Sequence, residues 1–264
     1  MADITAQMVK ALREETGQGM MDCKKALTEA NGDMEAAQDI LRKKGMDTAK
    51  KKAARTTAEG IVAIKVSQDG SSAAMVEVLC ETDFCARNDV FRAMVSAVAD
   101  LACECGDGAV EATAAITEAV QKTLTQIGEN MSFSRGIKLS APRIGTYIHH
   151  NNKVGVLVGV DGEIDDETLA DVCMHVAFSD PMGISPDDIP ADVAQKERQF
   201  ATQQAIESGK PPEIADKIVA GKMGKFLAAN ALLEQPFVRD DKKKVKDVLG
   251  PATVTAFARF AIGG

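Results

Sequence analysis

A β-hairpin followed by a helix can be read from residues 60–102, GIVAIKVSQDGSSAAMVEVLCETDFCARNDVFRAMVSAVADLA. Residues 61–66, IVAIKV, predict a first strand, and Asp69-Gly70 supplies a tight turn before a second apolar run at 75–79. The residues that recur at helical spacing are Phe91, Met94, Val95, Val98, Leu101 and Ala102. This stretch predicts a small antiparallel sheet covered by one helix.

The same order of elements returns in the second half of the chain. Residues 146–160 predict a hairpin around an Asn-Asn turn at 151–152. The helix that follows is predicted by Leu169, Val172, Cys173 and Val176. Between the two repeats, a helix over 116–127 ends at Gly128, and a strand is predicted over 131–139. We therefore expect two related hairpin-plus-helix units.

Three short helices are predicted before the first hairpin. Gly17 ends the first helix, a turn at 31–32 ends the second, and the third is capped by Asp33 and ended by Gly45. A bundle this small has little core, so we interpret it as a docking module. The basic residues of 49–55 follow as a linker, which we interpret as solvated and not bound to RNA.

Residues 190–234 predict two helices joined by a tight loop at 209–212. The apolar residues assigned to them are Val193, Phe200, Ala201, Ala205 and Ile206, then Ile214, Ile218, Met223, Phe226 and Leu227. Such an antiparallel helical hairpin, inserted within one α+β unit, either projects as an arm or folds flat on the core. The pattern alone leaves both arrangements open.

The predicted fold class is therefore α+β, in three parts. Residues 1–54 form the three-helix docking module and its basic linker, and residues 55–140 form the N-subdomain of the core. Residues 141–264 form the C-subdomain, with the helical hairpin at about 190–234.

Composition and charge narrow the function. Hydrophobic residues make up 45% and charged residues 27% of the 264 residues, and the formal net charge is -8. Such a surface repels phosphate backbones, so no direct nucleic-acid binding is expected, and the basic group Lys242, Lys243, Lys244 and Lys246 is interpreted as a solvated turn. No signal peptide or membrane span is recognisable. Six cysteines without a paired CxxC framework indicate a reducing compartment, so we expect a cytoplasmic protein.

The sequence offers little enzymatic chemistry. There is no phosphate-binding loop, because the glycines and lysines of 221–225 have the wrong spacing and fall inside a predicted helix. A metal site made of Cys173, His175 and either His149 or His150 is conceivable, but ordinary packing or surface roles are favoured. We therefore expect no enzyme, no catalytic residues, no bound metal and no cofactor.

Residues 80–89, CETDFCARND, join the second predicted strand to the following helix. Asn88 or Asp89 can cap that helix, which leaves residues 82–85 in a loop. Phe84 then has two interpretations. It either begins the core stripe that continues at Phe91, seven residues later, or it faces outward; the spacing by itself favours the core.

Several segments resemble, in order and over nearly the whole chain, motifs of the elongation factor Ts family. They are TGQGMMDCKKAL (16–27), EANGD (29–33), ETDF (81–84), IGEN (127–130), MHVA (174–177) and QPFV (235–238). The resemblance implies a ubiquitin-associated-like N-terminal module, two core subdomains and a projecting helical hairpin. It also implies a guanine-nucleotide exchange factor in protein biosynthesis, acting in translation elongation by protein–protein interaction. Such a factor binds elongation factor Tu in its GDP form and speeds GDP release, without binding nucleotide itself.

The resemblance also assigns site residues. The segment that disturbs the magnesium site of elongation factor Tu corresponds to Thr82, Asp83, Phe84 and Cys85. On this basis Phe84 is a partner-facing wedge, against the preference of the spacing. The other matched contacts are Ile127, Gly128, His149 and Val238, although His150 competes with His149 for its place.

The chain departs from the family pattern at a few places. Cys85 stands where Val is usual, and Arg239 replaces an apolar residue beside Val238. A C-terminal helix present in some members has no counterpart, so no contact through it is expected. Two other classes are kept as alternatives: a ubiquitin-associated-like adaptor with an unrelated partner, and a small α+β enzyme with converging titratable groups in a cleft.

Overall fold

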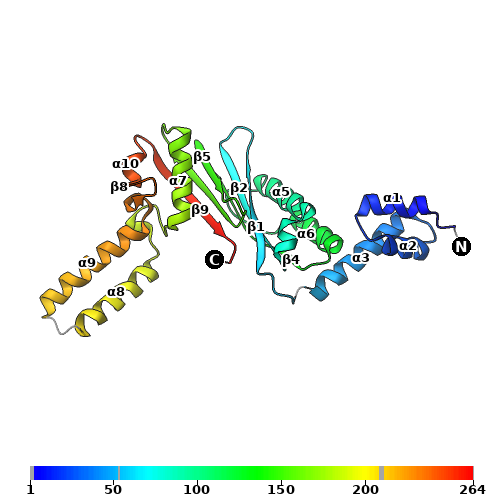
Figure 1. Ribbon diagram of the computed structural model, residues 1–264, viewed down its shortest axis with the longest axis horizontal. Helices are drawn as coiled ribbons and strands as arrows, with labels where there is room; N and C mark the ends of the chain where they lie inside the picture. Colours follow the sequence, from blue (N-terminus) through cyan, green and yellow to red (C-terminus); the bar gives the residue numbers. More distant parts are fainter. Residues whose placement is uncertain (1–2, 53, 208–210, 264) are drawn as a thin grey trace.

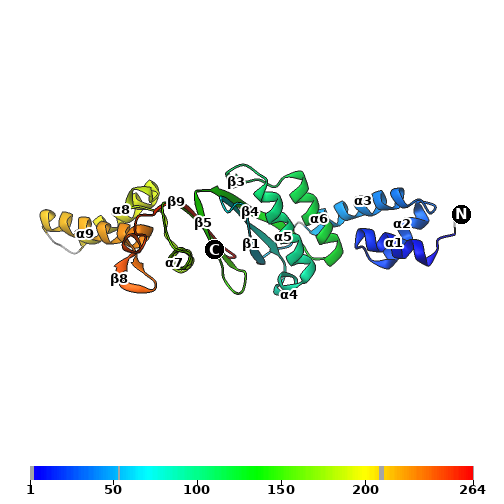
Figure 2. The ribbon, with the colours of Figure 1, turned by 90° about the horizontal axis from the view of Figure 1, so that it is seen from above.

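A computed structural model describes residues 3–52, 54–207 and 211–263 of the chain. Three helices lie at one end of the molecule, two small sheets with their helices form the middle, and a pair of long helices lies at the other end (Figure 1). The view from above shows the same linear order (Figure 2). None of the described helices combines the length and the apolarity that a membrane span requires.

The N-terminal helices are α1 (Ala6–Thr16), α2 (Met20–Glu29) and α3 (Met34–Lys52). They enclose a small core of Val9, Leu12, Cys23, Ala26, Leu27, Ala37 and Leu41. Gly17 ends α1 in the left-handed region with φ 68°, and Asp33 caps α3 by accepting from the amide of Ala36 at 3.0 Å. The prediction that Gly45 ends α3 is wrong. A Cβ at Gly45 would lie 2.9 Å from Oγ1 of Thr125, so this glycine serves close helix packing and not termination.

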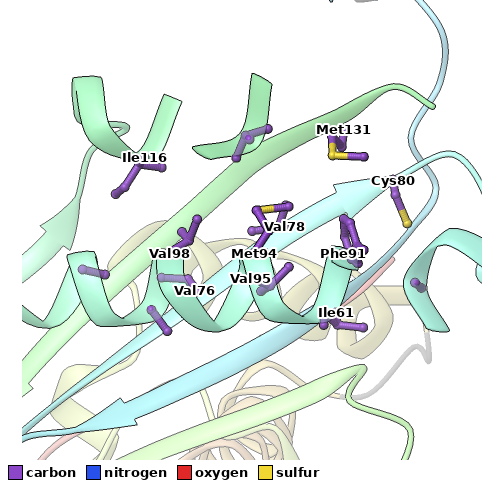
Figure 3. Close-up of a cluster of buried hydrophobic side chains, with 14 of the residues drawn as sticks. Ile61, Val76, Val78, Cys80, Phe91, Met94, Val95, Val98, Ile116 and Met131 are labelled. Carbon is purple, nitrogen blue, oxygen red and sulfur yellow. The ribbon is translucent and has the colours of Figure 1, made fainter. Parts of the chain in front are cut away.

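The first α+β unit has a four-stranded antiparallel sheet in the order β1-β2-β4-β3. Its strands are β1 (Glu59–Val66), β2 (Ser72–Cys80), β3 (Gly108–Val110) and β4 (Met131–Ser140), and its helices are α4 (Asp83–Arg87), α5 (Asp89–Cys103) and α6 (Ala114–Ile127). The predicted stripe on α5 packs against the sheet: Figure 3 shows Phe91, Met94, Val95 and Val98 beside Ile61, Val76 and Val78. Asn88 caps α5, as expected, by accepting from the amide of Val90 at 2.9 Å.

The second α+β unit has a three-stranded sheet in the order β5-β6-β9. Its main elements are β5 (Arg143–Ile148), β6 (Val154–Asp161), α7 (Asp166–Ser179) and β9 (Thr253–Ala261). Smaller elements between α7 and β9 are two 3-10 turns, Pro186–Asp188 and Leu232–Glu234, then β7 (Pro236–Phe237), β8 (Asp240–Lys244) and α10 (Val245–Val248). The hairpin and α7 match the sequence prediction. The third strand comes from the end of the chain, where the sequence prediction placed no strand.

The long helices are α8 (Ala191–Glu207) and α9 (Pro212–Asn230), which run away from the sheets (Figure 1). Their shared seam is made of Ala201, Ala205, Val219 and Met223, with Ala194, Ala215 and Phe226 beside it. Phe200 and Ile206, assigned to the apolar face from the sequence, are instead exposed, because small alanines allow the closest approach of the two helices. The predicted stop at Gly209–Lys210 lies outside the described residues. The helical pair ends before position 234, since Leu232 is buried in the core of the second unit.

The two sheets pack against each other through a separate apolar cluster. It contains Val62, Ala73 and Met75 from the first unit and Leu157, Ala258 and Phe260 from the second. At Gly155 the backbone of β6 comes so close that a Cβ would lie 2.5 Å from Cγ1 of Val62 and 2.9 Å from Sδ of Met75. The amide of Val62 also donates to the carbonyl of Asn152 at 2.7 Å, which ties the edge of β1 to the β5–β6 turn.

We expect Gly155→Ala to destabilise the protein by about 1–3 kcal/mol, because the stiff side chain of Val62 would have to move. Urea unfolding followed by circular dichroism measures the loss. Gly221→Ala in α9 is the control, since no atom lies within 4 Å of its added methyl group and alanine favours a helix. Equal midpoints for the two variants would show that the sheets do not need this close contact.

Candidate functional site

The turn between β2 and α5 presents the residues that the sequence singled out. Thr82 ends the extended chain with φ -128° and caps α4, its hydroxyl accepting from the amide of Cys85 at 3.1 Å. Asp83 therefore begins a short helix, whereas the sequence predicted a loop through Cys85. Asp83 pairs with Arg87 one turn later at 3.0 Å; the side chain of Arg87 is exposed and that of Asp83 is about half exposed.

Phe84 points into solvent, with 80% of the residue exposed. Its neighbours Cys85 and Ala86 face the core instead, at 3% and 8%. The core interpretation of Phe84 is therefore wrong. Phe84 and Phe91 do not share one helical face despite their seven-residue spacing. The extended backbone of Asn88, with ψ 132°, separates two helices of different direction.

Cys85 lies inside the core and is not available on the surface of the turn. The thiol of Cys80 donates to the carbonyl of Thr82 at 3.3 Å. The neighbouring Cys85 thiol, together with burial, raises the pKa of the Cys80 thiol, so that Cys80 remains neutral. Among the four residues predicted to act on the partner, Cys85 is thus placed to support the turn from beneath.

Two glutamates connect the turn to the end of α6. The carboxylate of Glu129 accepts from the amide of Thr82 at 3.1 Å and from its hydroxyl at 2.8 Å. In the opposite direction, the carboxylate of Glu81 accepts from the amide of Asn130 at 2.5 Å. That hydrogen bond lowers the pKa of Glu81, so Glu81 stays ionised. Neither glutamate was a candidate from the sequence, since an isolated carboxylate in a polar segment gives no signal of its partner.

The end of α6 brings Ile127 and Gly128 next to this turn. Gly128 has φ 88° and ends α6 by donating its amide to the carbonyl of Leu124 at 2.8 Å. Ile127 is half-buried against the core of the first unit. The structure therefore places Thr82–Phe84 and Ile127–Gly128 at one corner of the first unit, joined through Glu129.

The basic linker reaches the same corner: Lys51 and Arg55 are exposed, in agreement with a solvated segment, but two of its side chains also make contacts there. Lys52, at the end of α3, donates to the carbonyl of Gly128. Arg55 pairs with Glu81 at 3.3 Å, and its carbonyl accepts from the side-chain amide of Asn130 at 2.8 Å. The side chain of Lys50, which belongs to the same basic group, lies outside the described part of the chain.

His149 and Val238 lie on the second unit. His149 follows β5, and its Nδ1 is hydrogen-bonded to the hydroxyl of Tyr147 at 2.8 Å. Val238 follows β7 and is 39% exposed. Figure 2 shows α4, α7 and β8 along the same lower edge of the molecule. The predicted residues thus come from both units.

His175 holds Val238 in place and was missed as a site residue. It is buried, its Nδ1 accepts from the amide of Val238 at 3.2 Å, and its Nε2 lies 2.9 Å from Oε1 of Gln235. This pair of partners requires a neutral ring with the proton on Nε2. Burial lowers the pKa of His175, with the Gln235 hydrogen bond opposing it. Arg239, the departure noted beside Val238, is held against α7 by Asp171 at 2.9 Å.

The structure does not assemble the conceivable metal site. Cys173 is fully buried in the core of the second unit, where burial raises its pKa to about 12. His175 is occupied by Gln235 and Val238. In the residues that the structure describes, no group of three His, Cys, Asp or Glu side chains could hold a metal ion.

A groove of about 620 Å³ lies between α3 and α6. Most of the residues that line it are polar or charged, among them Gln38, Gln121 and an ion pair between Arg42 and Glu118 at 3.6 Å. Both members of that pair are about 70% exposed. The groove therefore lacks the desolvated, converging charged groups that an enzyme alternative would need.

The neutral state of His175 predicts a pH dependence. Its pKa in the folded protein is below the ordinary 6.5, so the unfolded chain binds the extra proton first as the pH falls. Stability is therefore complete above about pH 6.5 and declines below it. We expect the melting temperature to fall between about pH 7.5 and pH 5, and this fall to be smaller in His175→Gln. His150→Gln, at an exposed ring, should retain the wild-type pH slope. An unchanged slope in His175→Gln would contradict the assignment.

Comparisons with known proteins agree with the motifs. Residues 81–264 match the family described as Elongation factor TS. Elongation factor Ts of Hydrogenovibrio crunogenus is 46% identical over 98% of this chain and 92% of its own length. The protein of the same name from Hahella chejuensis is 45% identical over 100% of this chain and 93% of its own. That from Thiobacillus denitrificans is 47% identical, over 94% and 88%. The chain therefore belongs to the elongation factor Ts family.

Proposed function

We propose that this chain is the guanine-nucleotide exchange factor of elongation factor Tu, acting in translation elongation in the cytoplasm. It binds the GDP form of that GTPase and promotes GDP release by disturbing the magnesium and phosphate site. The observation that carries the proposal is Phe84, an aromatic ring that is 80% exposed at the tip of an otherwise well-anchored turn. Exposed aromatic residues on rigid elements are typical anchors of protein–protein interfaces.

Such a mechanism needs a shaped surface and no catalysis. A nucleotide held by magnesium and phosphate contacts leaves slowly, because several charge-assisted contacts must break together. A partner that prefers the open state of the GTPase shifts the equilibrium by its differential affinity for the two states. By linkage, the factor and the nucleotide weaken each other's binding equally. The arrangement of two exposed groups on two rigid units supports this role better than a cleft would.

Within this proposal the residues divide by position. Thr82, Asp83 and Phe84 act on the magnesium site, and Cys85 supports them from the core. Ile127 and Gly128 add contact beside the turn, while His149 and Val238 engage a second area of the same partner. The N-terminal helices dock on the GTPase domain and raise affinity.

The direct experiment is the release of labelled GDP from elongation factor Tu. We expect Phe84→Ala to leave the melting temperature nearly unchanged, because the ring is already solvated, and to reduce exchange efficiency by roughly thirtyfold or more at subsaturating factor. Phe200→Ala, at an exposed ring on α8, is the matched control and should exchange normally. A large fall in melting temperature with normal exchange by the folded fraction would sink the wedge assignment.

The isolated chain should bind neither GDP nor GTP, since the exchange role needs no nucleotide site of its own. Equilibrium dialysis with labelled nucleotide and no partner tests this. Binding at micromolar nucleotide would contradict the passive mechanism and favour a chain that handles nucleotide directly.

A further inference from the structure

We propose that Glu129 is a positioning residue that orients the Phe84 turn from behind, without touching the partner itself. The proposal rests on the exchange function above and adds a residue to it. The observation is the paired contact of one carboxylate with both donors of Thr82, the amide at 3.1 Å and the hydroxyl at 2.8 Å.

The chemistry of a hydroxyl explains why this contact sets the turn. A threonine hydroxyl has one hydrogen and two lone pairs. When Glu129 takes the hydrogen, a lone pair is left facing the amide of Cys85, which donates to it at 3.1 Å. Glu129 thereby fixes the direction of the N-cap. Without the carboxylate the hydroxyl can rotate, and the start of α4 loses its defined geometry.

The start of α4 in turn decides where Phe84 points. Phe84 is the second residue of this helix, and Cys85 and Ala86 are the ones buried in the core. The cap is fixed, and the side chains of Cys85 and Ala86 are buried. The ring of Phe84 must therefore point away from the core. A ring that already has its bound orientation loses less conformational entropy when it binds. More of the binding free energy is then available to distort the partner's nucleotide site.

A second carboxylate, that of Glu81, joins the same two segments in the opposite direction. Glu81 accepts from the amide of Asn130 at 2.5 Å, while Glu129 accepts from the amide of Thr82. The two adjacent pairs, 81–82 and 129–130, therefore hold each other reciprocally. Hydrogen bonds to charged groups are among the stronger ones, and a backbone donor left without its partner is costly.

The test is GDP release from elongation factor Tu over a range of factor concentrations. We expect Glu129→Ala to lower the maximal release rate about tenfold, the size expected for losing a hydrogen bond to a charged group. The half-saturating concentration should change less than about threefold, because the other contact areas still dock. Glu111→Ala, at an exposed carboxylate before α6, is the control and should behave as the wild type.

Variants of the Glu129–Thr82 contact separate positioning from general stability. Glu129→Gln keeps an acceptor oxygen for the Thr82 hydroxyl and should lose less than Glu129→Ala, whereas Thr82→Val removes the hydroxyl and should reproduce the defect of Glu129→Ala. The double variant Thr82→Val with Glu129→Ala should be no worse than either single one, because both act through the same contact. Additive defects in the double variant would show that Glu129 acts elsewhere. A raised half-saturating concentration with an unchanged maximal rate in Glu129→Ala would show that Glu129 contacts the partner directly. Either result overturns the proposal.

A measurement without the partner distinguishes this inference from the exchange function. Hydrogen exchange at the amides of Thr82 and Cys85 should accelerate in Glu129→Ala and Thr82→Val, but not in Glu111→Ala. If wild-type protein fails to release GDP while these amides behave as expected, the exchange function is wrong and the geometry stands. If wild-type protein exchanges and Glu129→Ala retains both the maximal rate and the amide protection, the positioning role is wrong.

Discussion

The contact between the two sheets fixes the position of every candidate partner-facing residue. Each unit covers one face of its sheet with helices, and the opposite faces pack against each other around Val62, Met75 and Leu157. Gly155 allows the backbone of β6 to approach this closely. Because packed sheets behave as rigid bodies, the Phe84 turn on one unit and Val238 on the other are held at a set separation. A single partner can therefore be engaged at two places at once.

Rigidity at these two places has the same physical origin. Phe84 and Val238 are exposed, yet a buried or half-buried polar group holds the backbone at each place. The carboxylate of Glu129 accepts from the amide of Thr82, two residues before Phe84, and the ring of His175 accepts from the amide of Val238. In both cases the supporting group accepts a hydrogen bond from a main-chain amide. The position of the supporting group therefore decides where the nearby apolar side chain, Phe84 or Val238, is presented. Binding surfaces built this way lose little conformational entropy on association.

Periodic patterns predicted most of the fold. The stripe on α5, the β1–β2 and β5–β6 hairpins, the capping of α3 and α5, and the end of α6 at Gly128 all follow from local spacing and turn chemistry. The predictions failed where a residue's role depends on a contact with a segment distant in the sequence. Gly45 was interpreted as a helix end but permits packing against Thr125, and β9 joins β6 over a separation of about a hundred residues that no local pattern reveals.

The candidate site was less predictable than the fold, for the same reason. The spacing from Phe84 to Phe91 suggested one core stripe, and only the family resemblance favoured an exposed ring, because periodicity cannot register the break at Asn88. Glu129, Glu81 and His175 act through partners between 47 and 63 residues away, so their roles exist only in the folded chain. A carboxylate or imidazole has no periodic signature, and its partner is decided by tertiary packing.

The corner at the end of α6 also joins the N-terminal module to the Phe84 turn. Lys52 binds the carbonyl of Gly128, and Arg55 binds Glu81, one residue from Thr82. The packing of Gly45 against Thr125 adds a contact on the same helix. The proposed docking module is thus joined by polar contacts to the corner that carries the Phe84 turn. A short hydrogen-bonded connection transmits orientation better than a free linker does. In the proposed mechanism, docking of the N-terminal module would therefore bring the Phe84 turn to the nucleotide site already aligned, with no flexible search between docking and insertion of the turn.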